Sequence, residues 1–156
     1  MYSHEIADYL ISFMDKNEYH YQFDRENGVI NARSDGKNAV ISMPIPILIE
    51  FKTWGYTLYG LFEKKADKTV RKEVIKYLTI ANYKLSIGNF VMNPNDGEVR
   101  FKVATDCVES TLSDDVIRGG IDAMLRAYEQ YGYQLFRVMF DLEDGETAAK
   151  LAKSNS

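Results

Sequence analysis

The chain has few of the residues that carry metal and redox chemistry: one cysteine and two histidines in 156 positions. A single cysteine, Cys107, excludes an intramolecular disulfide, so nothing requires an oxidising compartment. His4 and His20 have no other good ligand close by in sequence, whereas a zinc site needs at least three convergent ligands. We therefore expect no metal site, and we expect Cys107 to be a partly buried structural residue.

Long apolar runs and an excess of basic residues are also absent. The longest apolar run, Ile45–Ile49, is far shorter than a membrane span and contains Pro46. The segment Met1–Asp15 carries acidic side chains and no basic lead, unlike a signal peptide. The net charge is −4, and the chain lacks the basic surface that neutralises phosphates. The sequence therefore predicts a cytoplasmic protein that binds neither nucleic acid nor a membrane.

Motifs of familiar reactions are missing as well. The chain contains no G-x-S-x-G motif, no Walker loop and no G-x-G-x-x-G motif. The carboxylates Asp141, Glu143, Asp144 and Glu146 cluster near the end, but their spacing does not match a calcium loop. We therefore expect no catalytic residue, no metal ligand and no cofactor, and we expect that the protein is not an enzyme.

The composition that remains is typical of a soluble globular domain. Hydrophobic residues make up 46% of the chain and charged residues 27%, which are ordinary values. We expect residues 1–156 to form a single domain. The last part, residues 144–156, is small and polar, and it predicts either a short helix or a frayed tail.

Hydrophobic spacing predicts three helices, because apolar residues recur every three or four positions after Ser3, Asp67 and Ser113. Each of these three residues is an expected N-cap. If unbroken, the last helix, Ser113–Phe140, would be about 40 Å long at 1.5 Å per residue. The Gly119–Gly120 pair inside it predicts a close approach of this helix to a sheet.

Period-two alternation and turn residues predict five or six strands. The first two, Tyr19–Asp24 and Val29–Ala32, are expected to form a hairpin around Asn27–Gly28, a pair typical of a type I′ turn. Prolines at positions 44 and 46 cannot donate to a ladder, so we expect the segment Ala39–Phe51 to form an edge strand, or two short strands with an irregular junction. Further strands are predicted over 56–62, 88–92 and 98–104, with turns at Asp35–Gly36, Trp54–Gly55 and Asn95–Gly97.

The predicted order is α-β-β-β-(β)-α-β-β-α. Hairpins without a helix between each pair of strands indicate antiparallel pairing. We therefore predict an α+β fold in which helices pack on one face of an antiparallel β-sheet.

The chain is rich in aromatic residues, with eleven tyrosines, eight phenylalanines and one tryptophan. Tyrosine combines an apolar body with a polar tip and is favoured at interfaces. Phe51, Trp54, Tyr56 and Tyr59 lie beside the proline-containing segment, and they are the candidate partner-binding residues. The alternative is that these rings pack beneath the first helix.

One segment carries a family resemblance. It contains Asn82–Tyr83 with Leu85, then Gly88 and Phe90, then the run Asp96–Phe101. The hairpin at 27–28 upstream, and Tyr131, Leu135 and Glu146–Ala149 downstream, fit the same pattern. In these residues the chain resembles the YbjN family, bacterial proteins with a type III secretion chaperone-like fold.

The resemblance implies a regulatory or chaperone-like protein without catalytic residues. It also implies a homodimer that binds extended segments of partner proteins. Two further functions stay open from the residues alone. A domain that senses a small ligand predicts an apolar pocket with a few polar groups inside it. An enzyme predicts titratable groups with shifted pKa values gathered in a cleft.

Overall fold

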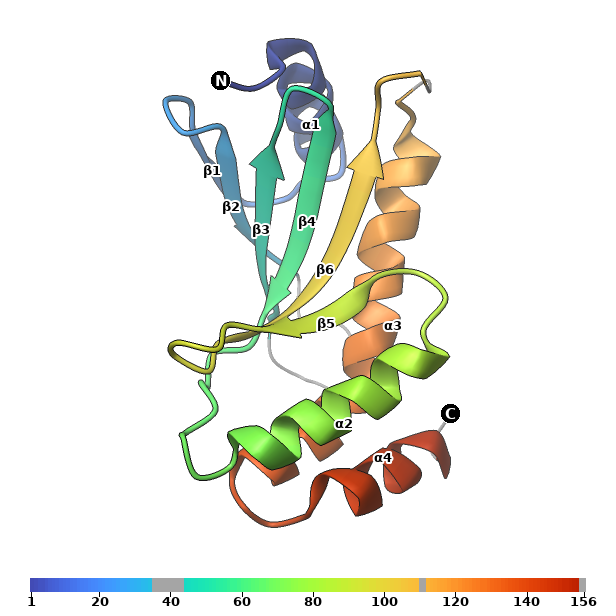
Figure 1. Ribbon diagram of the computed structural model, residues 1–156. Helices are drawn as coiled ribbons and strands as arrows, with labels where there is room; N and C mark the ends of the chain where they lie inside the picture. The colour runs from blue at the N-terminus through green and yellow to red at the C-terminus, as the bar shows by residue number, and fades with distance from the viewer. Residues whose placement is uncertain (35–43, 110–111, 155–156) are drawn as a thin grey trace.

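The computed structural model describes residues 1–34, 44–109 and 112–154 as an α+β fold, a six-stranded antiparallel sheet with four helices (Figure 1). The first half holds α1 (His4–Lys16), β1 (Tyr21–Asp24), β2 (Val29–Arg33), β3 (Pro46–Phe51) and β4 (Gly55–Leu61). The second half holds α2 (Arg71–Lys84), β5 (Asn89–Met92), β6 (Val99–Asp106), α3 (Asp114–Met139) and α4 (Gly145–Ser154). The predicted fold class is confirmed.

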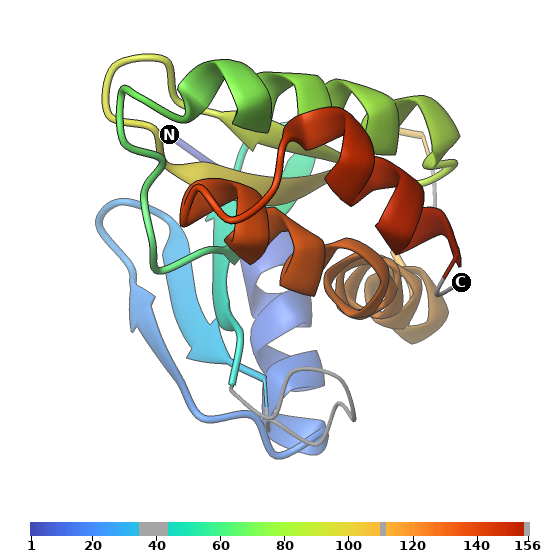
Figure 2. The same ribbon diagram turned by 90° about the horizontal axis from the view of Figure 1, so that it is seen from below.

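The strands lie in the order β1-β2-β3-β4-β6-β5, and each neighbouring pair is antiparallel. α1 and α3 cover one face of this sheet, while α2 runs beside β5, and α4 packs against α2 and α3 (Figures 1 and 2). Among the residues described, no helix lies on the opposite face of β2, β3 and β4 (Figure 1).

The register of the strands separates a core face from an open face. On the core face, Ile30, Ile49, Leu58 and Val103 lie side by side across β2, β3, β4 and β6, and all are buried. On the open face, Asn31, Leu48, Tyr59 and Lys102 form the neighbouring row. The alternation predicted for Val99, Phe101 and Val103 is confirmed, since all three are buried.

The predicted N-caps of the first and last long helices are also confirmed. The Ser3 side chain accepts a hydrogen bond from the backbone N–H of Ile6, and the Ser113 side chain accepts one from Val116. The second helix starts later than predicted. Asp67 lies in a turn, where its carbonyl accepts from Val70, and the helix begins at Arg71 without a side-chain cap. The tail forms α4, the short helix of the two alternatives.

The first hairpin is present, but its turn is not the predicted two-residue type I′ turn. Four residues, 25–28, connect β1 to β2, and only Gly28 has a positive φ, 67°. The Asp24 carboxylate accepts two hydrogen bonds from Asn27, at 3.0 and 2.7 Å, which lower the pKa of Asp24. These bonds stabilise a longer turn than the Asn-Gly pair indicates.

One prediction about packing is wrong, and another is confirmed only in part. Strand β3 does not lie at the edge but inside the sheet, between β2 and β4; Pro46 occupies its first position, where the missing donor is tolerated. Of the glycine pair in α3, Gly120 faces the sheet, since an added Cβ would lie 3.6 Å from Leu58 and 3.7 Å from Val103, whereas Gly119 meets nothing within 4 Å. The closest approach is made by Gly60 on β4, where an added Cβ would lie 2.7 Å from the sulfur of Met124. The predicted Asp35–Gly36 turn and the start of Ala39–Phe51 lie outside the described residues.

Two buried tyrosines differ in how their hydroxyls are paired. Tyr77 Oη donates to the carbonyl of Tyr131 at 2.6 Å, whereas Tyr128 Oη has no hydrogen-bond partner among the residues described. We expect Tyr77→Phe to lower the free energy of unfolding by about 1 kcal/mol, because it removes a buried hydrogen bond to a carbonyl that keeps its own bond within α3. Tyr128→Phe should leave this energy unchanged or raise it. Urea denaturation measures both, and equal losses would contradict this assignment.

Candidate functional site

The structure separates the four predicted partner-binding residues. Phe51 and Tyr56 are 3% and 2% exposed and point into the core face, so they present no surface to a partner. The Phe51 ring lies 6.0 Å from the ring of Tyr2 and 6.1 Å from that of Phe23. Trp54 lies in the turn between β3 and β4 and is 39% exposed, and Tyr59 is half-buried on the open face.

Tyr59 is already engaged by charges of its own sheet. The guanidinium of Arg100 lies 5.1 Å from the centre of the Tyr59 ring, and it also forms an ion pair with Glu98. Burial raises the pKa of Tyr59, and the nearby carboxylate of Glu50 raises it further. The open face around this ring is therefore a mixed surface, in which apolar groups alternate with paired charges.

A groove of about 590 Å³ lies next to Trp54, at the end of the sheet where α1 begins (upper end of Figure 1). We call it the α1 groove. Its walls come from the start of α1, the β3–β4 turn and the segment that follows β6. The lining residues are Ser3, Glu5, Ile6, Tyr9, Thr53, Cys107, Val108 and Leu112. Glu5 is the only charged residue among them.

Backbone hydrogen bonds join these walls. The N–H of Cys107 donates to the carbonyl of Trp54 at 2.8 Å, and the N–H of Ser3 donates to the carbonyl of Lys52 at 3.1 Å. The β3–β4 turn is thus bonded on one side to the segment after β6 and on the other to the start of α1. Backbone hydrogen bonds therefore hold the three walls of the groove together.

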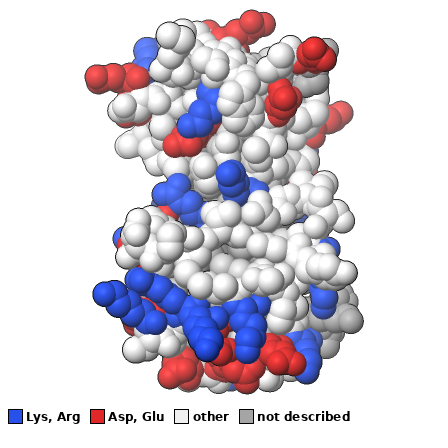
Figure 3. Space-filling model, in the orientation of Figure 1, with Lys and Arg blue, Asp and Glu red and all other residues white. Residues whose placement is uncertain are grey.

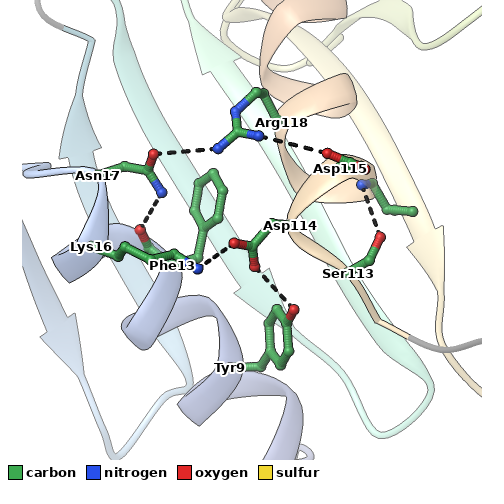
Figure 4. Close-up of polar contacts among 9 residues, drawn as sticks. Tyr9, Phe13, Lys16, Asn17, Ser113, Asp114, Asp115 and Arg118 are labelled. Atoms are coloured by element: carbon green, nitrogen blue, oxygen red, sulfur yellow. Dashed lines mark hydrogen bonds and ion pairs between the residues drawn. The ribbon is translucent and has the colours of Figure 1, made fainter.

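A carboxylate at the start of α3 clamps α1 beside the groove (Figure 4). Asp114 accepts a hydrogen bond from Tyr9 Oη at 3.0 Å and forms an ion pair with Lys16. The bond from Lys16 and then that from Tyr9 lower the pKa of Asp114, and the bond to the carboxylate raises the pKa of Tyr9. Because Tyr9 also lines the groove, this clamp sets the position of one wall.

A second set of contacts supports the clamp one turn further along α3 (Figure 4). Arg118 donates to the side-chain oxygen of Asn17 at 3.4 Å and lies 3.7 Å from the Asp115 carboxylate. Its guanidinium also lies 5.7 Å from the centre of the Phe13 ring. Both ends of α1 are therefore held: the first by Ser3 and Tyr9, the second by Lys16 and Asn17.

The groove is bordered by exposed apolar side chains and by acidic ones. Tyr9, Trp54 and Val108 are 37%, 39% and 67% exposed. The acidic side chain that lines the groove is that of Glu5. On the opposite, open face of the sheet, basic side chains gather near α2 (Figure 3). Burial raises the pKa of Cys107, and the neighbouring Asp106 raises it further, so this thiol stays protonated at neutral pH.

A smaller apolar hollow of about 200 Å³ lies between the start of β3, the end of β4 and α3. The Phe62 ring stacks on Tyr128 at 4.5 Å, and Phe136 meets Phe62 edge-on at 5.5 Å. Glu63 and Lys64 are the charged residues that line it. Burial raises the pKa of Tyr128 well above its ordinary value.

One contact that holds β5 in place was not predicted from the sequence. The side-chain amide of Asn82 donates to the carbonyl of Phe90 at 2.9 Å, and its oxygen accepts from the N–H of Phe90 at 2.7 Å. Asn82 therefore pairs with the outer edge of β5 as a neighbouring strand would. The signal in the sequence is an asparagine in the last turn of a helix that directly precedes a short strand.

Comparisons with known proteins identify no relative: no protein-family model matches the chain, and no curated protein matches it at a significant level. Within residues 1–34, 44–109 and 112–154, no helix has the length and apolar character needed to cross a membrane. In the same residues, no three His, Cys, Asp or Glu side chains are grouped as metal ligands.

The clamp predicts a pH dependence. Because the pKa of Asp114 is lower in the folded protein, its contribution to stability is present above the ordinary value of 3.8 and is lost as the pH falls through the folded-state value. We expect Asp114→Asn to flatten the acid limb of the unfolding free energy, measured by urea denaturation between neutral and acidic pH. Lys16→Met removes the hydrogen bond that lowers the pKa of Asp114 most, and its acid limb should lie between those of the original chain and Asp114→Asn. An acid limb unchanged by Asp114→Asn would contradict the clamp.

Proposed function

We propose that the protein is a non-enzymatic binding module, a chaperone-like or regulatory adaptor that holds an extended segment of another protein in the α1 groove. The single observation that carries this proposal is the exposure of Tyr9 and Val108 in the lining of a groove of about 590 Å³, with the exposed Trp54 in the turn that forms one of its walls. Exposed apolar side chains gathered at one concave site are typical of a docking surface.

The groove also indicates the chemistry of the segment. Trp54 and Tyr9 offer aromatic surface with a polar tip, which suits an apolar side chain of the partner. The carboxylate of Glu5 inside the groove favours a basic residue beside it. We therefore propose a segment in which apolar and basic residues alternate.

The shifted titratable groups support binding over catalysis. The lowered pKa values of Asp24, Asp96 and Asp144 arise from hydrogen bonds within turns and to the start of a helix, together with the Lys65 bond to Asp96. That of Asp114 arises from the clamp between α1 and α3. Each of these carboxylates has a structural contact that accounts for its shift.

The YbjN resemblance stays a proposal, and the Asn82 contact supports it. The matching residues Asn82, Gly88 and Phe90 form one structural unit here, because the asparagine pairs with the strand that the glycine introduces. The proposed cytoplasmic location and the proposed homodimer belong to the same resemblance.

The hollow between β3, β4 and α3 favours a second candidate, a regulatory domain that senses a small ligand. Its aromatic lining and the unpaired Tyr128 hydroxyl nearby are features of a small-molecule site. Its volume of about 200 Å³ is below the roughly 300–1,000 Å³ of sites for drug-sized ligands. Thermal shift against a panel of small aromatic metabolites tests this candidate. A ligand that raises the melting temperature of the original chain but not that of Phe136→Trp would support it.

Trp54 is the only tryptophan in the chain and follows Thr53 in the turn that forms one wall of the groove, so its fluorescence reports on that turn. We expect a library of basic-apolar peptides to contain members that shift the Trp54 emission to the blue, since binding removes water from the ring. Val108→Asp should weaken their binding at least tenfold, because it places a charge where apolar surface is buried, a loss of about 1.4 kcal/mol.

Ile87→Asp is the matched control. Ile87 is 54% exposed in the connection between α2 and β5, and it does not line the groove. This variant should bind as the original chain does. Equal losses in the two variants, or no peptide that shifts the emission, would reject the α1 groove as the binding site.

A further inference from the structure

The two edge strands of the sheet, β5 and β1, differ in what lies beside their outer sides. At β5, the outward N–H and C=O of Phe90 are both paired with the Asn82 side chain, and α2 runs beside the strand. At β1, no strand pairs with the outer edge within the described part of the chain, and both ribbon views show no helix beside it (Figures 1 and 2). The edge at β5 is therefore closed at Phe90, whereas the edge at β1 is uncovered over the whole strand.

The hydrogen-bond pattern tells which groups of β1 point outward. Phe51 N–H donates to the carbonyl of Gly28 at 2.9 Å, so the even-numbered residues of β2 face β3 and the odd-numbered ones face β1. Their partners in β1 are Gln22 and Asp24. The N–H and C=O groups of Tyr21 and Phe23 are consequently directed away from the sheet.

We propose that a second copy of this chain pairs with this edge, β1 against β1 in antiparallel orientation, with the two-fold axis beside Gln22. This register places Tyr21 opposite Phe23 of the second copy and Gln22 opposite its own equivalent. It pairs all four outward N–H groups of the two strands with outward carbonyls. A shift by two residues would need Tyr19, whose N–H already donates to Met14, or Arg25, whose carbonyl already accepts from Tyr2.

The side chains are complementary in the same register. Tyr21 and Phe23 are both half-buried on the core face, so each forms an aromatic pair with the other across the new junction. The two Gln22 side chains, exposed in the single chain, face each other as amides that both donate and accept. His20, just before β1, lies opposite Asp24 of the second copy and offers it a donor.

The edge lacks most of the features that prevent strand addition. β1 contains no proline and no lysine, and Tyr21 and Phe23 are aromatic. A shallow hollow of about 410 Å³ lies over the β1–β2 hairpin and is lined by His20, Tyr21, Gln22, Asn31, Ala32 and Arg33. β1 has only four residues, so the interface is small, and we expect a dimer that forms reversibly with concentration.

Charge at Gln22 tests the two-fold axis directly. Gln22→Lys and Gln22→Glu each place two like charges opposite one another, at a non-hydrogen-bonded pair where Cα atoms are only about 4.5 Å apart. We expect each variant alone to sediment as a monomer over about a hundredfold range of concentration in which the original chain forms dimers. Mixing the two variants should restore the dimer, because lysine then faces glutamate.

A second pair of variants tests the backbone. Phe23→Pro and Phe23→Val both remove the ring, but only proline removes the outward N–H. We expect Phe23→Pro to raise the dimer dissociation constant at least tenfold above that of Phe23→Val. If proline unfolds the hairpin, as circular dichroism would show, the charge variants still decide the matter.

Three outcomes overturn the proposal. The original chain could sediment as a monomer at every concentration, it could form a dimer that Gln22→Lys and Gln22→Glu leave intact, or the mixture of the two could stay monomeric. An extended peptide that binds the monomer and is lost with Phe23→Pro, but not with Val108→Asp, would make β1 a site for a foreign strand instead. Since the α1 groove shares no residue with β1, Val108→Asp should leave the dimer unchanged, and the two proposals fail separately.

Discussion

A β-strand can form backbone hydrogen bonds on two sides, so the outermost strands of an open sheet carry backbone groups without a strand partner. How these groups are satisfied is the main constraint on this structure. Four strands have neighbours on both sides, and β5 is paired from outside by the Asn82 amide. β1 presents outward groups along its whole length with no covering element among the described residues, whereas β5 pairs with β6 only over residues 99–102. The proposed dimer follows from this asymmetry and needs no rearrangement of the fold.

The core explains why the surfaces that remain lie where they do. Strand β4 sits between β3 and β6, and Gly60 within it lets Met124 and Tyr128 of α3 approach the sheet. The α1 groove lies between the start of α1, the β3–β4 turn and the segment that follows β6. The Asp114 clamp joins α1 to the start of α3 through Tyr9 and Lys16, and Tyr9 is one wall of the groove.

Features set by neighbouring residues were predictable from the sequence. Spacing at 99–103 indicates which side chains are buried, and Ser3 and Ser113 mark the true starts of their helices, because alternation and capping involve residues only a few positions apart. The strand order was not predictable, since Pro46 indicated an edge while its strand lies inside the sheet. Among the candidate site residues, Trp54 is exposed, but Phe51 and Tyr56 are buried. The α1 groove joins residues near 3–9, 53 and 107–112, which no local pattern relates.

Amide hydrogen exchange, followed residue by residue at low and high protein concentration, tests the central claim most directly. Phe90 N–H should be protected at both concentrations, because its partner Asn82 belongs to the same chain. The N–H groups of Tyr21 and Phe23 should exchange rapidly in dilute solution and become protected as the concentration rises. Protection of these two amides in dilute solution, or rapid exchange at every concentration, would contradict the account.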